Sequence, residues 1–294
     1  MTPAEQQFLT RNRLHETYLR SAEKWFSPLL EKIQPGGDKA LIIGINGSQG
    51  SGKSTLADYL CTMFKERHAL RSVSLSLDDF YLTQRERQEL SKRVHPLLET
   101  RGVPGTHDIP LAIQTIAQLV DGSGETVVPR FDKSQDDRMP AAQCDTVNGP
   151  VDIIILEGWC VGAKPQTEGQ LIEPLNSLEA DRDPDGVWRN AVNQALAGEY
   201  QTLFALLDLL IMLQAPSFDT VFNWRLEQEE KMLARLGDAA TKEQHQGIMS
   251  GNQIAQFIAH YQRITEQSLA EMPERADHLY RLDPQRQIVN CVHR

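Results

Sequence analysis

Residues 41–55 have the sequence LIIGINGSQGSGKST, in which an apolar run is followed by glycines, serines and a single lysine. The run from Leu41 to Ile45 has the pattern of a strand that is buried on both faces of a sheet. Residues 47–54 then match the pattern GxxxxGK[ST] in full. Glycines allow the backbone to adopt positive φ angles and to direct N–H groups at phosphate oxygens, where a Cβ atom would be crowded. The stretch therefore predicts a strand, a phosphate-binding loop and a helix in succession.

The chemistry of this loop assigns roles to its polar residues. The helix that begins near Ser54 directs its N-terminus at the same phosphate oxygens as the loop. Lys53 is expected to contact the β- and γ-phosphates, and the Ser54 hydroxyl is expected to bind Mg²⁺. The sequence thus predicts a nucleoside triphosphate site made of Gly47, Ser48, Gln49, Gly50, Ser51, Gly52, Lys53, Ser54 and Thr55.

The composition fits a soluble globular protein and limits its partners. The chain has 294 residues, of which 40% are hydrophobic and 24% charged. Its formal net charge of -10 argues against a general affinity for nucleic acid, and an anionic substrate would require a local cluster of Arg, Lys and His. No apolar run approaches the roughly 18 to 20 residues of a membrane span. We therefore expect a small-molecule partner, and neither nucleic acid nor membrane.

The cysteines and the N-terminal residues indicate a cytoplasmic protein. The cysteines are Cys61, Cys144, Cys160 and Cys291. They are widely separated and have no CxxC or metal-binding spacing, which is typical of free thiols in a reducing compartment. The range from Met1 to Arg20 is charged throughout and contains no apolar segment of the kind found in a secretory signal.

Apolar runs alternate with helical patterns along the chain. Strands are expected at residues 41–45, 72–77, 151–156, 207–213 and 278–282. Helices are expected at residues 55–66, 83–100, 108–120, 220–236 and 254–270. This alternation predicts an α/β protein with a P-loop NTPase-type parallel sheet of about five strands and helices on both faces.

Two segments lie outside this pattern. Residues 4–33 have helical spacing and end at the breaker Pro35-Gly36-Gly37, so residues 1–37 are expected to form an N-terminal helical arm before the domain at 38–294. Residues 163–200 have weak apolar content and several Asp, Glu, Pro and Gly residues. This second segment is expected to be an insertion on the rim of the domain, outside its core.

Other motifs distinguish between the classes of P-loop protein. GTPases need an NKxD motif for base recognition, and the chain contains none. A DxxG string at residues 183–186 lies in the polar segment and follows no strand, which indicates an accidental match. ATPase motors and transporters would usually bring further motifs or a longer chain. Small-molecule kinases remain, so residues 38–294 are expected to form a P-loop kinase domain.

Two acidic motifs follow predicted strands and favour a phosphotransfer site. The second strand leads into LDDFYL, residues 77–82, so its carboxylates emerge at the same sheet edge as the phosphate loop. Asp78 and Asp79 alternate sides in an extended chain, so only one of them is expected to face the γ-phosphate. The strand at 151–156 leads directly to Glu157, whose carboxylate is expected to lie on Mg²⁺ or its water shell.

Cations in polar segments could together hold an anionic substrate, although each could also be an ordinary surface charge. They are Arg101, His107, Arg130, Lys133 and Arg138. Asp108 fits the N-cap of the helix that follows it. Arg225 is expected to neutralise charge on the transferring phosphoryl group as a lid arginine, and Arg235 is a second candidate. From topology alone, residues 283–286 are the expected position for adenine recognition.

These motifs resemble those of a known family. GxxxxGKST, LDDFYL, RGxxGTHD, VPRFDKS, ILEGW and WRLxxE occur in the order found in plant-type D-glycerate 3-kinases. The chain also resembles related fungal and bacterial P-loop kinases, which lie near uridine kinase, phosphoribulokinase and bacterial pantothenate kinase. The resemblance covers residues 40–285. The phosphate loop is common to all P-loop proteins, whereas the combination of LDDFYL, GTHD and PRFDKS is much more specific.

The resemblance implies an ATP- and Mg²⁺-dependent kinase that transfers the γ-phosphoryl group to a hydroxyl of a small anionic metabolite, with D-glycerate as the leading candidate. Asp78 matches the catalytic base, because the acid stands two places before the aromatic Phe80. Glu157 matches the acid that holds the metal with Ser54, and Arg225 matches the lid arginine that acts with Lys53 in catalysis.

The resemblance also places the loop from Arg130 to Lys133 at the acceptor site. Together with the neighbouring motifs, it predicts that the acceptor contacts Asp79, Tyr81, Arg101, His107, Arg130 and Lys133. Asn223 stands where the plant pattern has an arginine before the lid tryptophan, and the stretch after Lys133 contains fewer glycines. These departures leave the phosphate-loop chemistry unchanged and concern the identity of the acceptor.

Two alternatives to a glycerate-type kinase remain open. The chain could be a nucleotide-binding switch or regulatory ATPase without a small-molecule acceptor, with residues 1–37 and 163–200 as partner surfaces. It could also be a kinase of a nucleoside or of a pantothenate-like acceptor. The acid–aromatic motif from Asp78 to Tyr81 favours a kinase, because a switch has no need of it.

Replacing Asp78 by Asn should remove turnover while ATP affinity is retained, because an amide cannot accept the proton of an attacking hydroxyl. Replacing Lys53 by Ala should remove both ATP binding and turnover. Calorimetric titration with ATP and an ADP-release assay measure the two effects. Unchanged phosphotransfer in Asp78→Asn would refute the base, and normal ATP binding in Lys53→Ala would refute the phosphate loop.

Overall fold

The computed structural model describes residues 1–33, 39–236 and 251–294, except for the side chains of residues 228, 229, 231–236 and 252. The predicted breaker at residues 35–37 falls outside the described residues, and so does the expected boundary between the arm and the P-loop domain. In the part of the chain that the structure describes, no helix combines the length and apolar character needed to cross a membrane.

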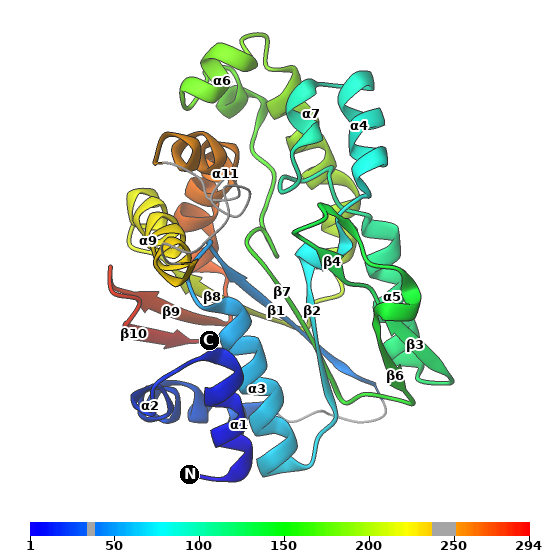
Figure 1. Cartoon of the computed structure of the whole chain (residues 1–294), viewed down its shortest axis with the longest axis vertical. Helices are drawn as coiled ribbons and strands as arrows, with labels where there is room; N and C mark the ends of the chain where they lie inside the picture. Colours follow the sequence, from blue (N-terminus) through cyan, green and yellow to red (C-terminus); the bar gives the residue numbers. More distant parts are fainter. Residues whose placement is uncertain (34–38, 237–250) are drawn as a thin grey trace.

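A six-stranded sheet forms the centre of the molecule, with the strand order β10-β9-β8-β1-β7-β2 (Figure 1). Its strands are β1 (Leu41–Gly47), β2 (Ser72–Ser76), β7 (Ile153–Gly158), β8 (Leu209–Gln214), β9 (His278–Leu282) and β10 (Ile288–His293). β1 pairs in parallel with both β7 and β8, and β2 and β9 extend the parallel arrangement on the two sides. The predicted α/β fold with a parallel sheet is thus confirmed.

The strand β10 was not expected from the sequence pattern. It runs antiparallel to β9 and lies at the edge of the sheet. Val289 and Asn290 are exposed, and the other residues of β10 are only partly buried. An edge strand has a neighbour on one side only, so it does not need the continuous apolar run that marks the inner strands.

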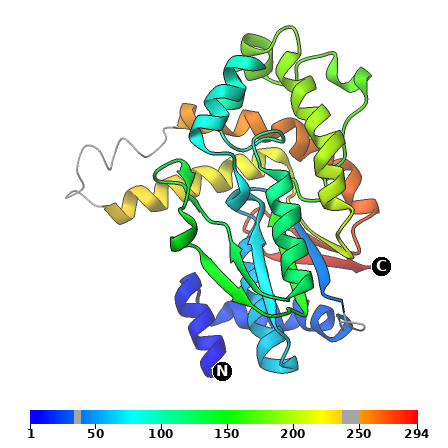
Figure 2. The same cartoon turned by 90° about the vertical axis from the view of Figure 1, so that its right-hand side faces the viewer.

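Helices cover both faces of the sheet (Figures 1 and 2). The helices longer than one turn are α1 (Pro3–Asn12), α2 (Thr17–Lys32), α3 (Lys53–His68), α4 (Gln84–Arg93), α5 (Ile109–Asp121), α6 (Ser177–Arg182), α7 (Val187–Ala195), α9 (Phe218–Leu236) and α11 (Gly251–Glu271). Ile43 and Ile45 pack with α1, α2 and α3, whereas Ile42 and Ile154 pack with α5 and α7 on the opposite face. Because successive side chains alternate between faces, both inner strands must be apolar throughout.

Short elements complete the second face of the sheet. They are α8 (Gln201–Phe204) and the two-stranded pairs β3 (Glu125–Val128) with β6 (Asp145–Asn148) and β4 (Phe131–Asp132) with β5 (Asp137–Arg138). The β4–β5 hairpin carries Lys133 in its turn. It therefore brings part of the predicted acceptor loop next to the residues that follow β2.

The segment 163–200 belongs to the core, so the expectation that it lies on the rim is wrong in this respect. Trp188, Val192, Leu196 and Tyr200 are buried in the same apolar cluster as α5. Their spacing is that of an amphipathic helix, but the Asp, Pro and Gly residues around it dilute the apolar signal. Asp183 of the DxxG string accepts the backbone N–H of Trp188 at 2.7 Å, which gives this string a structural role at the start of α7.

The N-terminal helices predicted for residues 4–33 are present and form a layer of the domain. Phe8 is fully buried, and its ring centre lies 5.6 Å from the ring centres of both Tyr18 and Tyr59. Arg11 donates to both carboxylate oxygens of Asp58 on α3, at 2.7 and 2.6 Å. These aromatic side chains bury apolar surface between the N-terminal helices and α3, so the two helices are expected to stabilise the whole domain.

Replacing Phe8 by Ala should lower the free energy of unfolding by about 3 to 5 kcal/mol, because it leaves a cavity between α1, α2 and α3. Urea denaturation followed by circular dichroism measures this change. Gln7 is exposed on the same helix, so Gln7→Ala should change stability by about 0.5 kcal/mol or less. A loss below about 1 kcal/mol for Phe8→Ala would show that the N-terminal helices contribute little to the fold.

Candidate functional site

The phosphate loop joins the end of β1 to the start of α3, as predicted. Gly47 is the last residue of β1, and Lys53 is the first residue of α3. Gly52 has a φ of 91°, in the left-handed region that favours glycine. A Cβ atom on Gly47 would lie 2.4 Å from Ser51 Oγ. Glycine is therefore needed at both ends of the loop, at one for backbone conformation and at the other for close packing.

Several polar atoms of the loop have no hydrogen-bond partner in the part of the chain that the structure describes. The hydroxyls of Ser48 and Ser51 and the side-chain oxygen of Gln49 are buried without a hydrogen bond to any described residue. Buried polar atoms are normally paired, so such a group indicates a ligand or a water molecule. The N-terminus of α3 adds partial positive charge at the same place. The arrangement suits an anionic ligand such as a phosphate chain.

Ser54 and Glu157 place two oxygen ligands beside the loop. The Ser54 hydroxyl donates to Glu157 Oε1 at 2.7 Å, across the pairing of β1 with β7. The Glu157 side chain is 4% exposed, and its Oε2 has no partner among the described residues. This donor set fits Mg²⁺, which binds oxygen ligands from one or two protein groups together with substrate phosphates. Within the described residues no cluster of three or more His, Cys, Asp or Glu side chains could hold a metal.

Asp78 lies on a short 3-10 turn, residues 77–80, that directly follows β2. Its Oδ1 accepts a hydrogen bond from the Tyr81 hydroxyl at 2.9 Å, and its Oδ2 accepts one from Lys133 Nζ at 2.8 Å. Burial disfavours the charged form, but the charges of Lys133 and Lys53 outweigh burial and lower the pKa of Asp78 to about 2. The carboxylate is therefore ionised at neutral pH, as a proton acceptor requires.

Asp79 faces a different part of the molecule. Its Oδ2 accepts Arg130 Nη1 at 2.9 Å, and its Oδ1 accepts the backbone N–H of Phe131 at 3.2 Å. The side chains of Asp78 and Asp79 thus point in different directions, as predicted. The reason differs from the prediction, because the two residues lie on a turn and not in an extended chain. In this arrangement Asp79 holds the start of the β4–β5 hairpin, and its contact with an acceptor stays a prediction.

His107 is buried and is not a cation, so the expectation that it adds positive charge is wrong. Its ring stacks on Tyr81 with a centre-to-centre distance of 4.4 Å. The Tyr200 hydroxyl accepts the N–H of Gly105 at 3.0 Å, and its oxygen lies 2.5 Å from His107 Nδ1, at hydrogen-bonding distance. Burial lowers the pKa of His107 to about 4, because a charged imidazole is disfavoured away from water. Its contact with an acceptor, as a neutral group, stays a prediction.

The predicted arginines of the acceptor site are already paired with carboxylates. The ion pairs are Arg101–Asp136, Arg130–Asp79, Arg130–Asp145 and Arg138–Asp108. Asp108 also accepts the N–H of Leu111 and so caps α5, as expected. Lys133 differs from the arginines because its side chain is 60% exposed and its partner is the predicted base. It is the predicted cation best placed to turn toward an incoming anion.

Arg225 lies on α9, with its guanidinium 5.8 Å from the centre of the Phe257 ring on α11. This position does not test its expected role on the transferring phosphoryl group, which stays a prediction. The side chain of the second candidate, Arg235, lies outside the described residues.

Two residues of this region lie outside the sequence motifs: Tyr200, and Arg286 in the loop that was expected to recognise adenine. Arg286 Nε donates to the backbone oxygen of Gly50 at 2.9 Å, and Arg286 Nη2 pairs with Glu227 at 2.6 Å. Tyr200 reaches His107 from the segment that was expected on the rim. Neither residue belongs to a sequence motif, because the contacts of each join parts of the chain that are distant in sequence.

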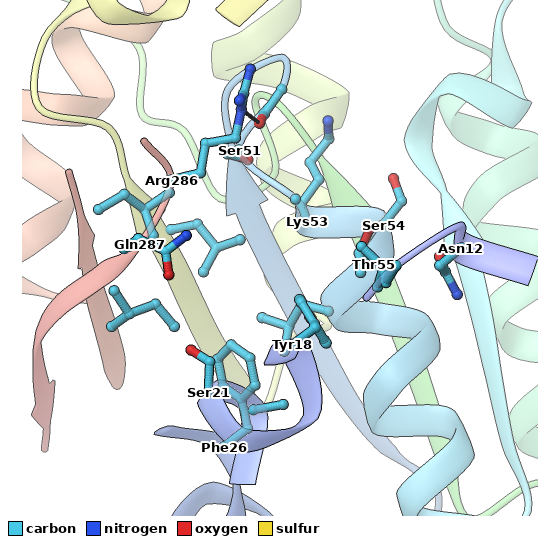
Figure 3. A pocket seen from close by; sticks show the side chains of 18 of the residues that line it. Asn12, Tyr18, Ser21, Phe26, Ser51, Lys53, Ser54, Thr55, Arg286 and Gln287 are labelled. Carbon is cyan, nitrogen blue, oxygen red and sulfur yellow. Dashed lines mark hydrogen bonds between the residues drawn. The ribbon is translucent and has the colours of Figure 1, made fainter. Parts of the chain in front are cut away.

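A cavity of about 740 Å³ opens beside the phosphate loop (Figure 3). Its lining includes residues 50–56, which form the second half of the loop and the first turn of α3. The other walls come from residues 12–26 of the N-terminal helices and from residues 282–288 around the β9–β10 turn. Lys53, Ser54 and Thr55 lie along one side of this cavity in Figure 3.

Known proteins with similar sequences are kinases. The uncharacterized kinase mug58 of Schizosaccharomyces pombe is 37% identical over 247 residues, which cover 79% of this chain and 82% of that protein. A Saccharomyces cerevisiae protein named "Probable ATP-dependent kinase TDA10" is 32% identical over 237 residues, or 73% of this chain and 76% of that protein. No protein-family model matches the chain.

A solved structure has the same fold over nearly the whole chain. D-glycerate 3-kinase from Cryptococcus neoformans var. grubii serotype A matches with a TM-score of 0.70 at 26% sequence identity. The match covers 99% of this chain and 99% of that chain. The likeness therefore includes the N-terminal helices as well as the sheet.

The buried neutral His107 should make the protein less stable in acid. Between pH 6.5 and 4 the unfolded chain binds a proton at this residue that the folded chain does not, so the free energy of unfolding falls as pH falls. The contribution of His107 to this fall in the free energy of unfolding is on the order of 3 kcal/mol. Burial and the neighbouring His293 lower the pKa of His278 to about 4. This histidine therefore also lowers the free energy of unfolding as the pH falls.

Urea denaturation at several pH values should therefore show a shallower pH dependence for His107→Gln than for the parent protein between pH 6.5 and 4. His68 is exposed, and His68→Gln should follow the parent curve. Parallel curves for the parent and His107→Gln would contradict a neutral buried His107.

Proposed function

The chain belongs to the family of P-loop kinases related to D-glycerate 3-kinase, and on this premise we propose that it phosphorylates a hydroxyl of a small anionic metabolite with ATP and Mg²⁺. D-glycerate is the leading acceptor. The observation that carries the proposal is the position of Asp78. Its carboxylate accepts a hydrogen bond from Lys133 Nζ, and the positive charge of Lys53 acts on it as well. A base next to the γ-phosphate and a movable cation next to the base suit an acceptor that carries a carboxylate as well as a reactive hydroxyl.

In the proposed reaction, the acceptor oxygen forms a bond to the γ-phosphorus while the bond from the γ-phosphorus to the β–γ bridging oxygen breaks, and ADP leaves. Asp78 orients the hydroxyl and takes its proton. The phosphate loop and Lys53 hold the phosphates in line with the acceptor, and Arg225 neutralises charge on the transferring group. Mg²⁺, bound near Ser54 and Glu157, would neutralise charge on the phosphates.

Lys133 links acceptor binding to the state of the base. An acceptor carboxylate would compete with Asp78 for the Lys133 ammonium group. Once Lys133 turns to the acceptor, Asp78 loses a hydrogen bond and part of the positive charge that lowers its pKa. The carboxylate then becomes a stronger proton acceptor at the moment when the hydroxyl is in place. A neutral nucleoside would not produce this exchange, which favours an anionic acceptor over a nucleoside.

Replacing Lys133 by Ala should raise the KM for the anionic acceptor by about 10- to 100-fold, the usual range for loss of one charged hydrogen bond. The KM for ATP should stay near that of the parent. Lys65 is exposed on the far end of α3 from the phosphate loop, so Lys65→Ala serves as a control with the same loss of charge.

An ADP-release assay against hydroxy acids, nucleosides, sugars and pantothenate provides the measurement. Turnover that depends on a hydroxy acid, with D-glycerate best, supports the proposal. If a nucleoside or pantothenate were the preferred substrate, that compound would take the place of D-glycerate as the assigned acceptor. Slow ADP release without dependence on any acceptor would favour a nucleotide switch.

A further inference from the structure

We propose that Asp136 is a positioning residue of the acceptor site, which holds the turn of the β4–β5 hairpin so that Lys133 stays beside Asp78. The turn consists of residues 133–136, with Lys133 at its first position and Asp136 at its last. The inference rests on the proposed function, because it concerns the lysine that is expected to meet the acceptor. It goes beyond that function by assigning a role to a residue that lies outside the sequence motifs.

The backbone of Asp136 is in the left-handed region, with a φ of 54°. This region favours glycine, and an aspartate there raises the energy of the turn, although Asn and Asp enter it more readily than other residues with a side chain. Such a conformation persists where the surrounding structure holds it. The contacts of the Asp136 carboxylate therefore decide whether the turn keeps its shape.

Two arginines from different parts of the chain bind the Asp136 carboxylate. Arg87 Nη2, on α4, donates to Asp136 Oδ2 at 2.6 Å and to the backbone oxygen of the same residue at 3.0 Å. Arg101 Nη1, in the loop that precedes α5, donates to Asp136 Oδ1. Both oxygens of the carboxylate thus have an arginine partner, which fixes its position and its orientation.

Arg87 is a rigid anchor for this carboxylate. Its side chain is 1% exposed, and it forms an ion pair with Asp136. Its Nε and Nη1 also donate to the backbone oxygens of Glu99 and Leu82, at 3.2 and 3.1 Å. Leu82 ends the motif that contains Asp78. A buried guanidinium needs a negative partner, because an uncompensated charge is costly away from water. The ion pair therefore ties the turn to the segment that carries the proposed base.

The Phe131 ring joins the same arginines to the proposed base. The guanidinium groups of Arg87 and Arg101 lie 5.7 and 5.4 Å from the centre of this ring. The Tyr81 ring centre lies 5.2 Å from it, and the Tyr81 hydroxyl donates to Asp78. This packing fixes the strand β4 relative to the base, so the turn is the part of the hairpin whose position depends on the carboxylate.

The rest of the turn is stiff, so a contact at one end affects the other. Asp132 Oδ1 accepts the backbone N–H of Ser134 at 2.8 Å and its hydroxyl at 2.6 Å, which is the pattern of an Asx turn. Asp132 and Asp137 pair across the hairpin. A movement of Asp136 would therefore displace Lys133, whose ammonium group reaches the proposed base at 2.8 Å.

A different role for this carboxylate would be to hold Arg101 until an acceptor anion displaces it. The exposed fraction of the side chain is 27% for Arg101 and 60% for Lys133, and Arg101 also lies on the Phe131 ring. Lys133 is thus the less constrained of the two cations. The two roles predict opposite effects when the charge of Asp136 is removed, because a released Arg101 would bind the anion more tightly.

The test is Asp136→Asn, which removes the charge and keeps the shape of the side chain. Asparagine tolerates the left-handed region, and its amide oxygen can still accept a hydrogen bond from Arg87, so the variant should fold. We expect the KM for the acceptor to rise by about threefold to tenfold, less than in Lys133→Ala, because the lysine is displaced and not lost. The KM for ATP should stay within about twofold of the parent.

An ADP-release assay with the hydroxy acid that the parent phosphorylates fastest, D-glycerate first, measures both constants. Asp185 is exposed in the turn before α7, so Asp185→Asn is a control with the same loss of charge and should match the parent. Asp136→Gly allows the same backbone conformation without a carboxylate and should behave as Asp136→Asn does. Thermal melting shows whether each variant is folded, and Asp136→Gly takes the place of Asp136→Asn if the latter does not fold.

A double-mutant cycle shows whether Asp136 acts through Lys133. In the Lys133→Ala background, Asp136→Asn should change the KM for the acceptor by less than about twofold, because no lysine remains to be positioned. A residue with a purely structural role would instead lower kcat in both backgrounds by the same factor, since fewer molecules would be active, and would leave the KM unchanged.

An unchanged KM for the acceptor in Asp136→Asn would overturn the inference while the proposed function stands. A lower KM would also overturn it, in favour of a direct role of Arg101. Equal effects in both backgrounds of the cycle would leave Asp136 with a structural role only. A parent protein that phosphorylates no hydroxy acid, or a Lys133→Ala variant with an unchanged KM for the acceptor, would refute the proposed function and this inference with it.

Discussion

The close turn from β1 into α3 is the constraint on which the rest of the site depends. A protein with a net charge of -10 repels a phosphate chain at long range, so the attraction must be local. Gly47 and Gly52 let the loop close on itself, and at the N-terminus of α3 the loop has buried polar atoms that no described residue pairs with. Because β1 is flanked by parallel strands on both sides, acidic residues that follow β7 and β2 reach the same edge. The position of the loop at this edge thus brings Glu157 and Asp78 close to it.

Charge balance at this edge explains how one carboxylate can remain ionised in a largely buried place. Lys53 and Lys133 together lower the pKa of Asp78, although burial alone would raise it. The arginines around them are paired with carboxylates of their own, which limits the excess positive charge. The site is therefore nearly neutral until its ligands arrive. Because Lys133 is the most exposed of the cations paired here, its movement would change the positive charge around Asp78.

Local patterns predicted the fold and the position of the phosphate loop, and the differences between prediction and structure have a common cause. The inner strands were recognisable because both of their faces are buried, as the isoleucines of β1 and β7 show. β10 was missed because an edge strand has no such pattern, and residues 163–200 were placed on the rim because polar residues interrupt their apolar spacing. The sequence pattern groups His107 with the cations, because a sequence contains no information on the burial that keeps this ring neutral.

The sequence by itself determined the phosphate loop, the alternation of the inner strands with helices, and the acids after β2 and β7, because each depends on neighbouring residues and on the period of the backbone. Only the tertiary structure decided which cations are already paired and that His107 is neutral. It also decided that α1, α2 and the β9–β10 turn meet beside the loop, where Arg286 reaches the oxygen of Gly50. These properties depend on burial and on contacts between segments that are distant in the chain, which no local pattern encodes.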